Sequence, residues 1–310
     1  MRRIFVLGIS LFLAWNMSAQ EKGYEFSVVK ENPITSIKNQ ANSGTCWSFS
    51  GVGFLESELI RMKKGEHDLS DMYIVRRNYA DKAMKYVRTD GHVNFSQGGS
   101  FADVIETLGE YGVLPEESYN GLNYGETTHK HSEMEKVLSG YVNAISSNPN
   151  KKLSTAWFNG FNAVLDTYMG SLPNNVTVEG KTYTAQEYAK YLGLDASNYI
   201  SLTSYTHHPF YTPFALEIAD NWRWALSYNV PIDELMEVVD NALNSGYTIA
   251  WATDVSEVGF TRDGLAVIPD DNDPENVGSD QAHWLGLSQT EKNNKMKTLV
   301  SQGPVKEKAI

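Results

Sequence analysis

Residues 37–50 read IKNQANSGTCWSFS, and this stretch contains Cys46, the single cysteine of the 310-residue chain. Polar sequence with a glycine precedes Cys46, and the apolar residues after it recur at the spacing of a helix over residues 47–64. The pattern therefore predicts that Cys46 lies where a loop meets a helix. A thiolate at that point is stabilised by the helix dipole and by unpaired backbone N–H groups, which makes it a nucleophile near neutral pH.

A second residue of this stretch fits the same chemistry. Gln40 lies six residues before Cys46, and we expect its side-chain amide to turn back toward the thiol. With the backbone N–H of Cys46 it would offer two donors to a tetrahedral oxyanion, and losing one such donor costs roughly 3–4 kcal/mol of barrier in a serine protease. The alternative is that Cys46 is simply a small buried apolar residue, as free cysteines usually are.

Residues 43–49, taken with Gln40, closely resemble the nucleophile motif of papain-like cysteine peptidases. The first position of that motif is a cysteine in many relatives and is Ser43 here, which points to the disulfide-free branch that contains bleomycin hydrolase and aminopeptidase C. The resemblance implies an α+β papain-like fold. It also implies a thiol peptidase, most like an aminopeptidase, that cleaves peptides through a Cys46 acyl-enzyme with Gln40 as oxyanion donor, and it implies no cofactor and no metal.

Other segments extend the resemblance over roughly residues 30–310. Residues 97–100 (QGGS) resemble the glycine pair that lines the substrate cleft of the family, so Gly98 and Gly99 are predicted to bind the substrate through their bare backbone. Segments similar to family elements also occur at 69–79, 111–115, 206–211 and 250–255.

The order of the expected elements indicates an α+β fold with segregated layers rather than a doubly wound parallel sheet. Further helices are predicted from Ser70 onward and over 101–111, 154–169, 184–192 and 231–244. Strand-like sequence follows at 247–254 and 265–268. We interpret residues 20–310 as one papain-like peptidase domain with a helical insertion over about 120–245 and an incomplete C-terminal β subdomain.

Residues 1–19 have the basic start, the apolar run and the small final residue of a secretory signal peptide. The alternative, a buried N-terminal helix, is less consistent with this order of regions. The prediction is an exported protein, periplasmic or secreted, with no membrane segment once the signal is removed. The net charge of −12 argues against binding to nucleic acid, which needs an excess of lysine and arginine.

A cysteine peptidase also needs a histidine that pairs with the thiolate and protonates the leaving amine. The spacing of papain places that histidine at about 176–196 in this chain, and the window contains none. His283 comes late enough but lacks the small residue and the strand pattern that follow the family histidine. His207 and His208 fit a structural loop, His129 and His131 an exposed polar stretch, and no histidine is spaced with carboxylates as in a zinc site.

We therefore expect the catalytic histidine and asparagine beyond Ile310, and little or no peptidase activity from the chain as given. The alternative is a non-catalytic, peptide-binding pseudo-peptidase, and a transglutaminase-like acyltransferase fits less well because it does not share the spacing of Gln40 and Cys46. Peptides are the expected partners. Relatives that assemble into closed rings imply, by analogy alone, a homo-oligomer.

Overall fold

The computed structural model describes residues 27–150, 152–253 and 290. Lys30–Trp251 forms one compact unit, and every element below belongs to it. The expected signal peptide at 1–19, the strand expected at 265–268 and His283 lie outside the described residues.

Seven α-helices and five short strands are described in this unit. The helices are α1 (Cys46–Arg61), α2 (Asp71–Arg88), α3 (Phe101–Tyr111), α4 (Ser132–Ser146), α5 (Ala156–Met169), α6 (Ala185–Leu192) and α7 (Ile232–Asn244), with 3-10 turns η1 (Glu116–Ser118) and η2 (Ala196–Asn198). The strands are β1 (Val176–Val178), β2 (Lys181–Tyr183), β3 (Leu202–Thr203), β4 (Pro213–Ala215) and β5 (Leu226–Asn229).

Capping residues explain where the predicted helices begin and end. The Ser70 hydroxyl accepts the backbone N–H of Tyr73 and starts α2 as predicted. Ser100 and Asp103 form a capping box at the start of α3, and Gly112 ends this helix with a φ of 82°, a conformation that favours glycine. Both boundaries of α3 therefore agree with the sequence prediction.

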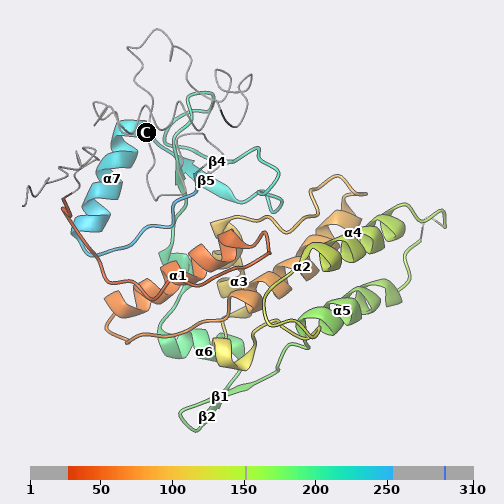
Figure 1. Cartoon of the computed structure of the whole chain (residues 1–310). Coiled ribbons are helices and arrows are strands. Elements are labelled where there is room, and N and C mark those ends of the chain that lie inside the picture. Colours follow the sequence, from red (N-terminus) through yellow and green to blue (C-terminus); the bar gives the residue numbers. More distant parts are fainter. Residues whose placement is uncertain (1–26, 151, 254–289, 291–310) are drawn as a thin grey trace, which may run out of the picture. The chain divides into compact units, whose positions relative to one another are not determined.

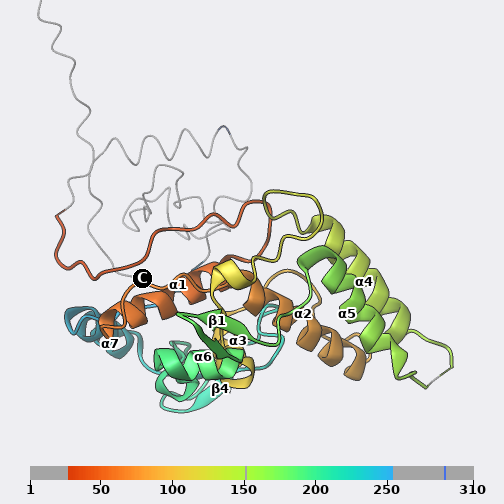
Figure 2. The same cartoon turned by 90° about the horizontal axis from the view of Figure 1, so that it is seen from below.

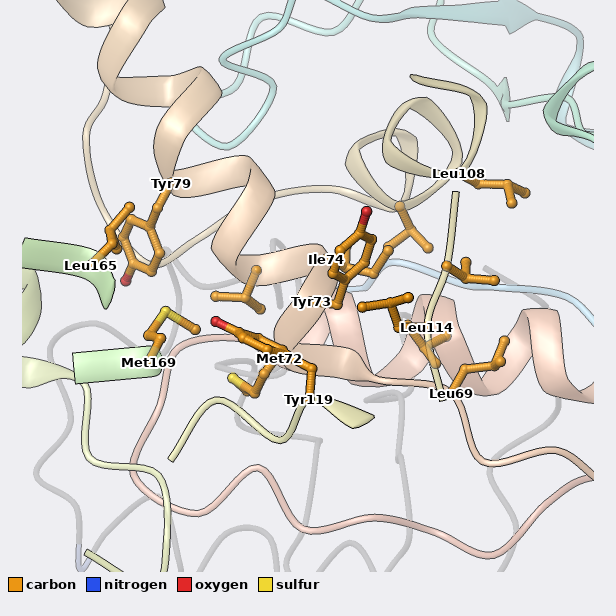
Figure 3. Packing of buried hydrophobic residues seen from close by; sticks show 14 of the residues in the cluster. Leu69, Met72, Tyr73, Ile74, Tyr79, Leu108, Leu114, Tyr119, Leu165 and Met169 are labelled. Carbon is orange, nitrogen blue, oxygen red and sulfur yellow. The ribbon is translucent and has the colours of Figure 1, made fainter. Parts of the chain in front are cut away.

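Helix α2 lies at the centre of the unit and packs against α1, α3, α4 and α5 (Figure 1). Its buried side chains meet those of its neighbours in one continuous core, in which Met72, Tyr73 and Ile74 of α2 lie among residues such as Leu108 and Leu165 (Figure 3). Burying each such side chain contributes about 1.5–3 kcal/mol, so this core holds the helix that begins at Cys46 in place.

Helix α4 was not among the predicted elements. It buries Met134, Leu138 and Val142 at a spacing of four residues and packs beside α5 against α2, as both views show (Figures 1 and 2). The apolar residues recur in the sequence at the spacing of an amphipathic helix, with polar and charged residues between them, so the signal for this helix was present.

The strands form two small sheets. β1 and β2 make an antiparallel hairpin. β5 is the middle strand of the other sheet, parallel to β3 and antiparallel to β4, with Leu202 opposite Tyr228 and Phe214 opposite Ser227.

Two expectations about this region need correction. A strand was expected at 247–254. Residues 247–253, the part of this segment that the structure describes, do not form one despite their β-branched and aromatic side chains. The insertion expected to be helical over about 120–245 holds four helices but also all five described strands, so it is mixed. Among the described residues, no helix has both the length and the apolar character that crossing a membrane requires.

Candidate active site

Cys46 is the first residue of α1, and its side chain is exposed. The interpretation of Cys46 as a buried apolar residue is therefore wrong. The carbonyl of Thr45 accepts the N–H groups of Ser48 and Phe49, which starts the helix. Within residues 27–150 and 152–253, the backbone N–H of Cys46 has no hydrogen-bond acceptor, so it is free to meet a negatively charged oxygen.

The loop before Cys46 is closed by its own side chains. The Gln40 amide Nε2 donates to the carbonyl of Ser43 at 2.6 Å, and the Ser43 hydroxyl donates to the carbonyl of Gln40 at 2.8 Å. The hydroxyls of Ser43 and Thr45 are 2.6 Å apart and share a hydrogen bond. One amide hydrogen of Gln40 is thus used within the loop. Donation of the other to an oxyanion beside Cys46 stays a prediction.

Gln97 fastens the Cys46 loop to the segment that carries the glycine pair. Its side-chain oxygen accepts the N–H of Gly44 at 2.7 Å, and its amide donates to Glu135 at 2.5 Å. Its carbonyl accepts the indole N–H of Trp47 at 2.9 Å. The sequence analysis quoted Gln97 only as part of a motif and gave it no role.

Each residue of the glycine pair is a glycine for a steric reason. A Cβ on Gly99 would lie 2.7 Å from Trp47 Cε2 and 2.8 Å from an oxygen of Asp103. A Cβ on Gly98 would collide with the carboxylate of Asp220. The pair therefore packs tightly against α1 on one side and has Asp220 beside it, while its pairing with a peptide substrate stays a prediction.

Beneath the glycine pair lies a buried lysine. Lys82 is 3% exposed, and its ammonium group donates to the carbonyls of Ser96 at 2.9 Å and Gly98 at 2.5 Å. Burial lowers the pKa of Lys82 to about 8, while the charges of Asp103 and Asp220 oppose this shift. Both hydrogen bonds survive loss of the proton, because a neutral amine still has two N–H groups.

Asp220 reaches Gly98 from a distant part of the sequence because the residues after it dock on α2 and α3. Arg223 donates to Asp103 at 2.8 Å and to Asp81 at 2.7 Å. The indole of Trp222 donates to Asp103 at 3.2 Å. Asp103 is 1% exposed. Its buried carboxylate accepts hydrogen bonds from the Arg223 guanidinium, the Trp222 indole and the backbone N–H of Ser100. Asp220 itself is exposed, and the sequence analysis did not identify it.

Residues 129–131 run beside the Cys46 loop. The N–H of Asn42 donates to the carbonyl of His129, and the N–H of His131 donates to the carbonyl of Asn42. The prediction of an exposed stretch is wrong for His131, which is 1% exposed and has no hydrogen-bond partner on either ring nitrogen among the residues that the structure describes. Burial lowers the pKa of His131 to about 4, with a smaller contribution from His129, so its ring is neutral at pH 7.

In the described part of the chain, no histidine hydrogen-bonds to the Cys46 sulfur. His67 contacts the carbonyl of Lys64, and His207 and His208 contact Glu217. The sequence analysis found no histidine spaced with carboxylates as in a zinc site, yet the structure brings Glu217 to both His207 and His208. Glu217 follows β4, and the chain between residues 208 and 217 folds back to make these contacts.

A known protein family matches the part of the chain that contains these residues. The model of the papain family of cysteine proteases matches residues 23–190, which include Gln40, Cys46 and the glycine pair. The chain belongs to the papain family. The matched residues include the exposed thiol at the start of α1, and its role as the nucleophile stays a prediction.

Two relatives of the papain-family chain come from Lactobacillus delbrueckii subsp. lactis. Aminopeptidase C is 24% identical over 279 residues, which cover 74% of this chain and 61% of that protein. Aminopeptidase G is 23% identical over 264 residues, which cover 73% of this chain and 60% of that protein. The chain thus spans about three-fifths of the length of the relatives it matches.

A solved structure supports the α+β papain-like fold. The crystal structure of PepW from Lactobacillus rhamnosis superposes with a TM-score of 0.56 at 17% sequence identity, over 71% of this chain and 59% of that one. The likeness in fold and the two aminopeptidase relatives agree with the predicted branch of the family.

Proposed function

We propose that this papain-family protein is a thiol peptidase that uses Cys46 as its nucleophile. The observation that carries the proposal is the exposed Cys46 side chain at the first turn of α1, with its own backbone N–H unpaired among the described residues. The thiolate attacks the carbonyl carbon of a peptide bond and forms a C–S bond as the carbonyl oxygen becomes negative. The C–N bond then breaks, the amine leaves with a proton from an acid, and water hydrolyses the thioester.

We propose that the oxyanion is bound by the Cys46 backbone N–H and by the second amide hydrogen of Gln40. The first amide hydrogen is bonded to the Ser43 carbonyl, which fixes the side chain within the loop that leads to Cys46. A donor held in advance stabilises developing charge without reorganising during the reaction. The glycine pair would then bind the backbone of the substrate beside this site.

We further propose that substrates are peptides with a free N-terminal amino group. Two relatives are named aminopeptidases. In this chain the exposed carboxylate of Asp220 lies against Gly98, beside the proposed substrate backbone. A carboxylate there would attract an α-ammonium group and would disfavour substrates in which a peptide continues beyond that point.

A second candidate function is peptide binding without catalysis. It is favoured by one observation, that no histidine of the described residues hydrogen-bonds to the Cys46 sulfur. For the same reason we propose that residues 1–310 on their own turn peptides over slowly. Both candidates would bind a peptide beside Cys46, so the reactivity of the thiol distinguishes them.

Alkylation of residues 1–310 by iodoacetamide across a range of pH, followed by mass spectrometry, tests the peptidase proposal. The expected result is rapid labelling of Cys46 that stays faster than labelling of a small free thiol at pH 6, because the start of α1 stabilises the thiolate without help from a histidine. A Cys46→Ser variant should not be labelled and serves as the control. Labelling no faster than a small thiol over the whole range would overturn the peptidase and leave the peptide binder.

We also propose export through a signal peptide over residues 1–19. The support is the order of basic, apolar and small residues in that segment. Expression in a Gram-negative host followed by N-terminal sequencing of the periplasmic protein tests it. Gln20 at the new N-terminus is the expected result, and an intact Met1 on cytoplasmic protein would contradict the proposal.

A further inference from the structure

Three potential metal ligands converge near the start of β4, apart from the residues proposed for peptide cleavage. His207 Nε2 lies 3.3 Å from one oxygen of Glu217, and His208 Nε2 lies 3.1 Å from the other. One ligand atom from each of the three residues lies within 4.8 Å of the others. The side chains are exposed or half-buried, so an ion could enter from solvent.

A buried amide holds the backbone of the two histidines. Asn229 of β5 is fully buried, and its Nδ2 donates to the carbonyls of Tyr205, His208 and Pro209 at 2.9–3.2 Å. Its Oδ1 accepts the N–H of Tyr205 at 2.8 Å. The loop that carries the histidines is thus tied to the middle strand of the sheet.

An aromatic ring holds the imidazoles themselves. The ring of His208 stacks on Phe214 with centroids 3.9 Å apart and planes inclined by 22°, and the ring of His207 meets Phe214 edge-on at 6.1 Å. Phe214 belongs to β4, which leads directly to Glu217. Both imidazoles are therefore oriented by packing as well as by their contact with the carboxylate, as a preorganised ligand set requires.

The distances suit a shared cation better than direct ion pairs. Charge-assisted N–H···O bonds are usually about 2.7–2.9 Å long, and both contacts here are longer. Ligands about 2.0–2.1 Å from a tetrahedral zinc ion lie roughly 3.3 Å from one another, which is close to the two nitrogen–oxygen distances, and all three ligand atoms lie within 4.8 Å of each other. Two protonated imidazoles with centroids 4.5 Å apart would also repel each other, whereas a metal binds the neutral form of both.

We propose that His207, His208 and Glu217 bind one divalent transition-metal ion, with zinc the best match and water completing the coordination. Two imidazoles and one carboxylate are typical zinc ligands, while calcium and magnesium prefer an all-oxygen set. The ion links the loop at 205–209 to the segment that follows β4. This proposal does not depend on the peptidase activity.

Isothermal titration with ZnCl₂, in a Cys46→Ala background so that the thiol cannot contribute, tests the site. We expect one zinc ion per chain, and at least a tenfold weaker affinity in Glu217→Gln and in His208→Ala. The exposed His92 takes no part in the cluster, so a His92→Ala variant is the matched control and should bind as tightly as the parent.

A second readout uses cobalt, whose visible spectrum reports coordination geometry. The parent should develop intense d–d bands of a tetrahedral site, which Glu217→Gln should lose while keeping the circular dichroism of the folded parent. Zinc should also raise the melting temperature of the parent but not of Glu217→Gln. Zinc affinity equal in the parent and in both cluster variants, or the absence of a one-to-one site in the parent, would overturn the proposal.

Discussion

The indole N–H of Trp47 donates to the main-chain carbonyl of Gln97 at 2.9 Å, joining the residue after Cys46 to the residue before the glycine pair. The Gln97 side chain adds a second link by accepting the N–H of Gly44. These bonds set the distance between the Cys46 loop and the proposed substrate backbone. The spacing of the site thus depends on Gln97 as well as on the residues expected to react.

Replacing Gln97 by alanine removes the bonds to Gly44 and Glu135 but keeps the main-chain bond to Trp47. The free energy of unfolding should fall by about 1–2 kcal/mol, since each net hydrogen bond is worth about 1 kcal/mol. Urea denaturation measures the loss. The exposed Gln186 makes one comparable bond far along the chain, so Gln186→Ala is the control for losing a single surface amide. Equal losses in both variants would contradict a special role for Gln97.

Gly99→Ala should destabilise the fold by about 1–3 kcal/mol, because the added methyl group overpacks against Trp47 and Asp103. Gly53→Ala is a control that should raise the stability of the fold. A Cβ at Gly53 meets nothing within 4 Å, and alanine is favoured over glycine inside a helix by up to about 1 kcal/mol. Thermal melts of the two variants should therefore shift in opposite directions, and a neutral Gly99→Ala would count against the tight packing of the pair.

Gln40→Ala should slow the reaction of Cys46 with a peptidyl chloromethyl ketone by about 10²–10³-fold, because that reaction passes through a tetrahedral oxyanion. Reaction with iodoacetamide forms no oxyanion and should change little. The comparison of the two rate constants, measured by mass spectrometry, separates oxyanion binding from a general loss of thiol reactivity. An equal decrease with both reagents would mean that Gln40 acts only by closing the loop.

Asp220→Asn should remove the preference for a free α-amino group. An aminoacyl chloromethyl ketone should label Cys46 about fivefold more slowly in this variant, the effect of losing a partly exposed charge pair worth about 1 kcal/mol. Its N-acetylated counterpart, which has no ammonium group, should label parent and variant at similar rates. A preference for the free amine that survives in Asp220→Asn would exclude Asp220 as its source, without affecting the assignment of Cys46.

His131 should make the protein less stable in mild acid. Burial holds the pKa of its ring at about 4 in the folded chain, below the ordinary value of 6.5, so between these values the unfolded chain binds more protons. The free energy of unfolding should therefore fall as the pH drops from about 6.5 to about 4, by up to about 3 kcal/mol.

Urea denaturation at pH 7 and pH 4.5 checks this dependence. His131→Leu should lose most of it, since leucine does not titrate and fills the buried site. The exposed His92 gives the control variant His92→Leu, which should keep the parent's pH dependence. An unchanged pH dependence in His131→Leu would assign the effect to other groups.

The sequence was most informative where structure depends on local signals. Ser70 and Gly112 are the expected boundaries because capping depends on only a few neighbouring residues. The position of Cys46 at a helix start was predictable for the same reason.

Features that depend on contacts between distant residues were missed. Asp220 reaches Gly98 only because Arg223 and Trp222 dock on α2 and α3, and no pattern around residue 220 indicates this. His131 is buried where the residues before α4 run beside the Cys46 loop, with its N–H bonded to the carbonyl of Asn42. The segment at 247–253 has strand-forming residues, yet no strand among the described residues pairs with it.

The docking of residues 220–223 has an evolutionary consequence. The proposed nucleophile and the proposed selectivity carboxylate lie on stretches that are far apart in the chain, joined through the buried Asp103. Substitutions around Asp220 could alter which peptide ends are accepted while leaving the Cys46 loop intact. A protein built in this way can change its substrate selectivity while it keeps the same catalytic chemistry.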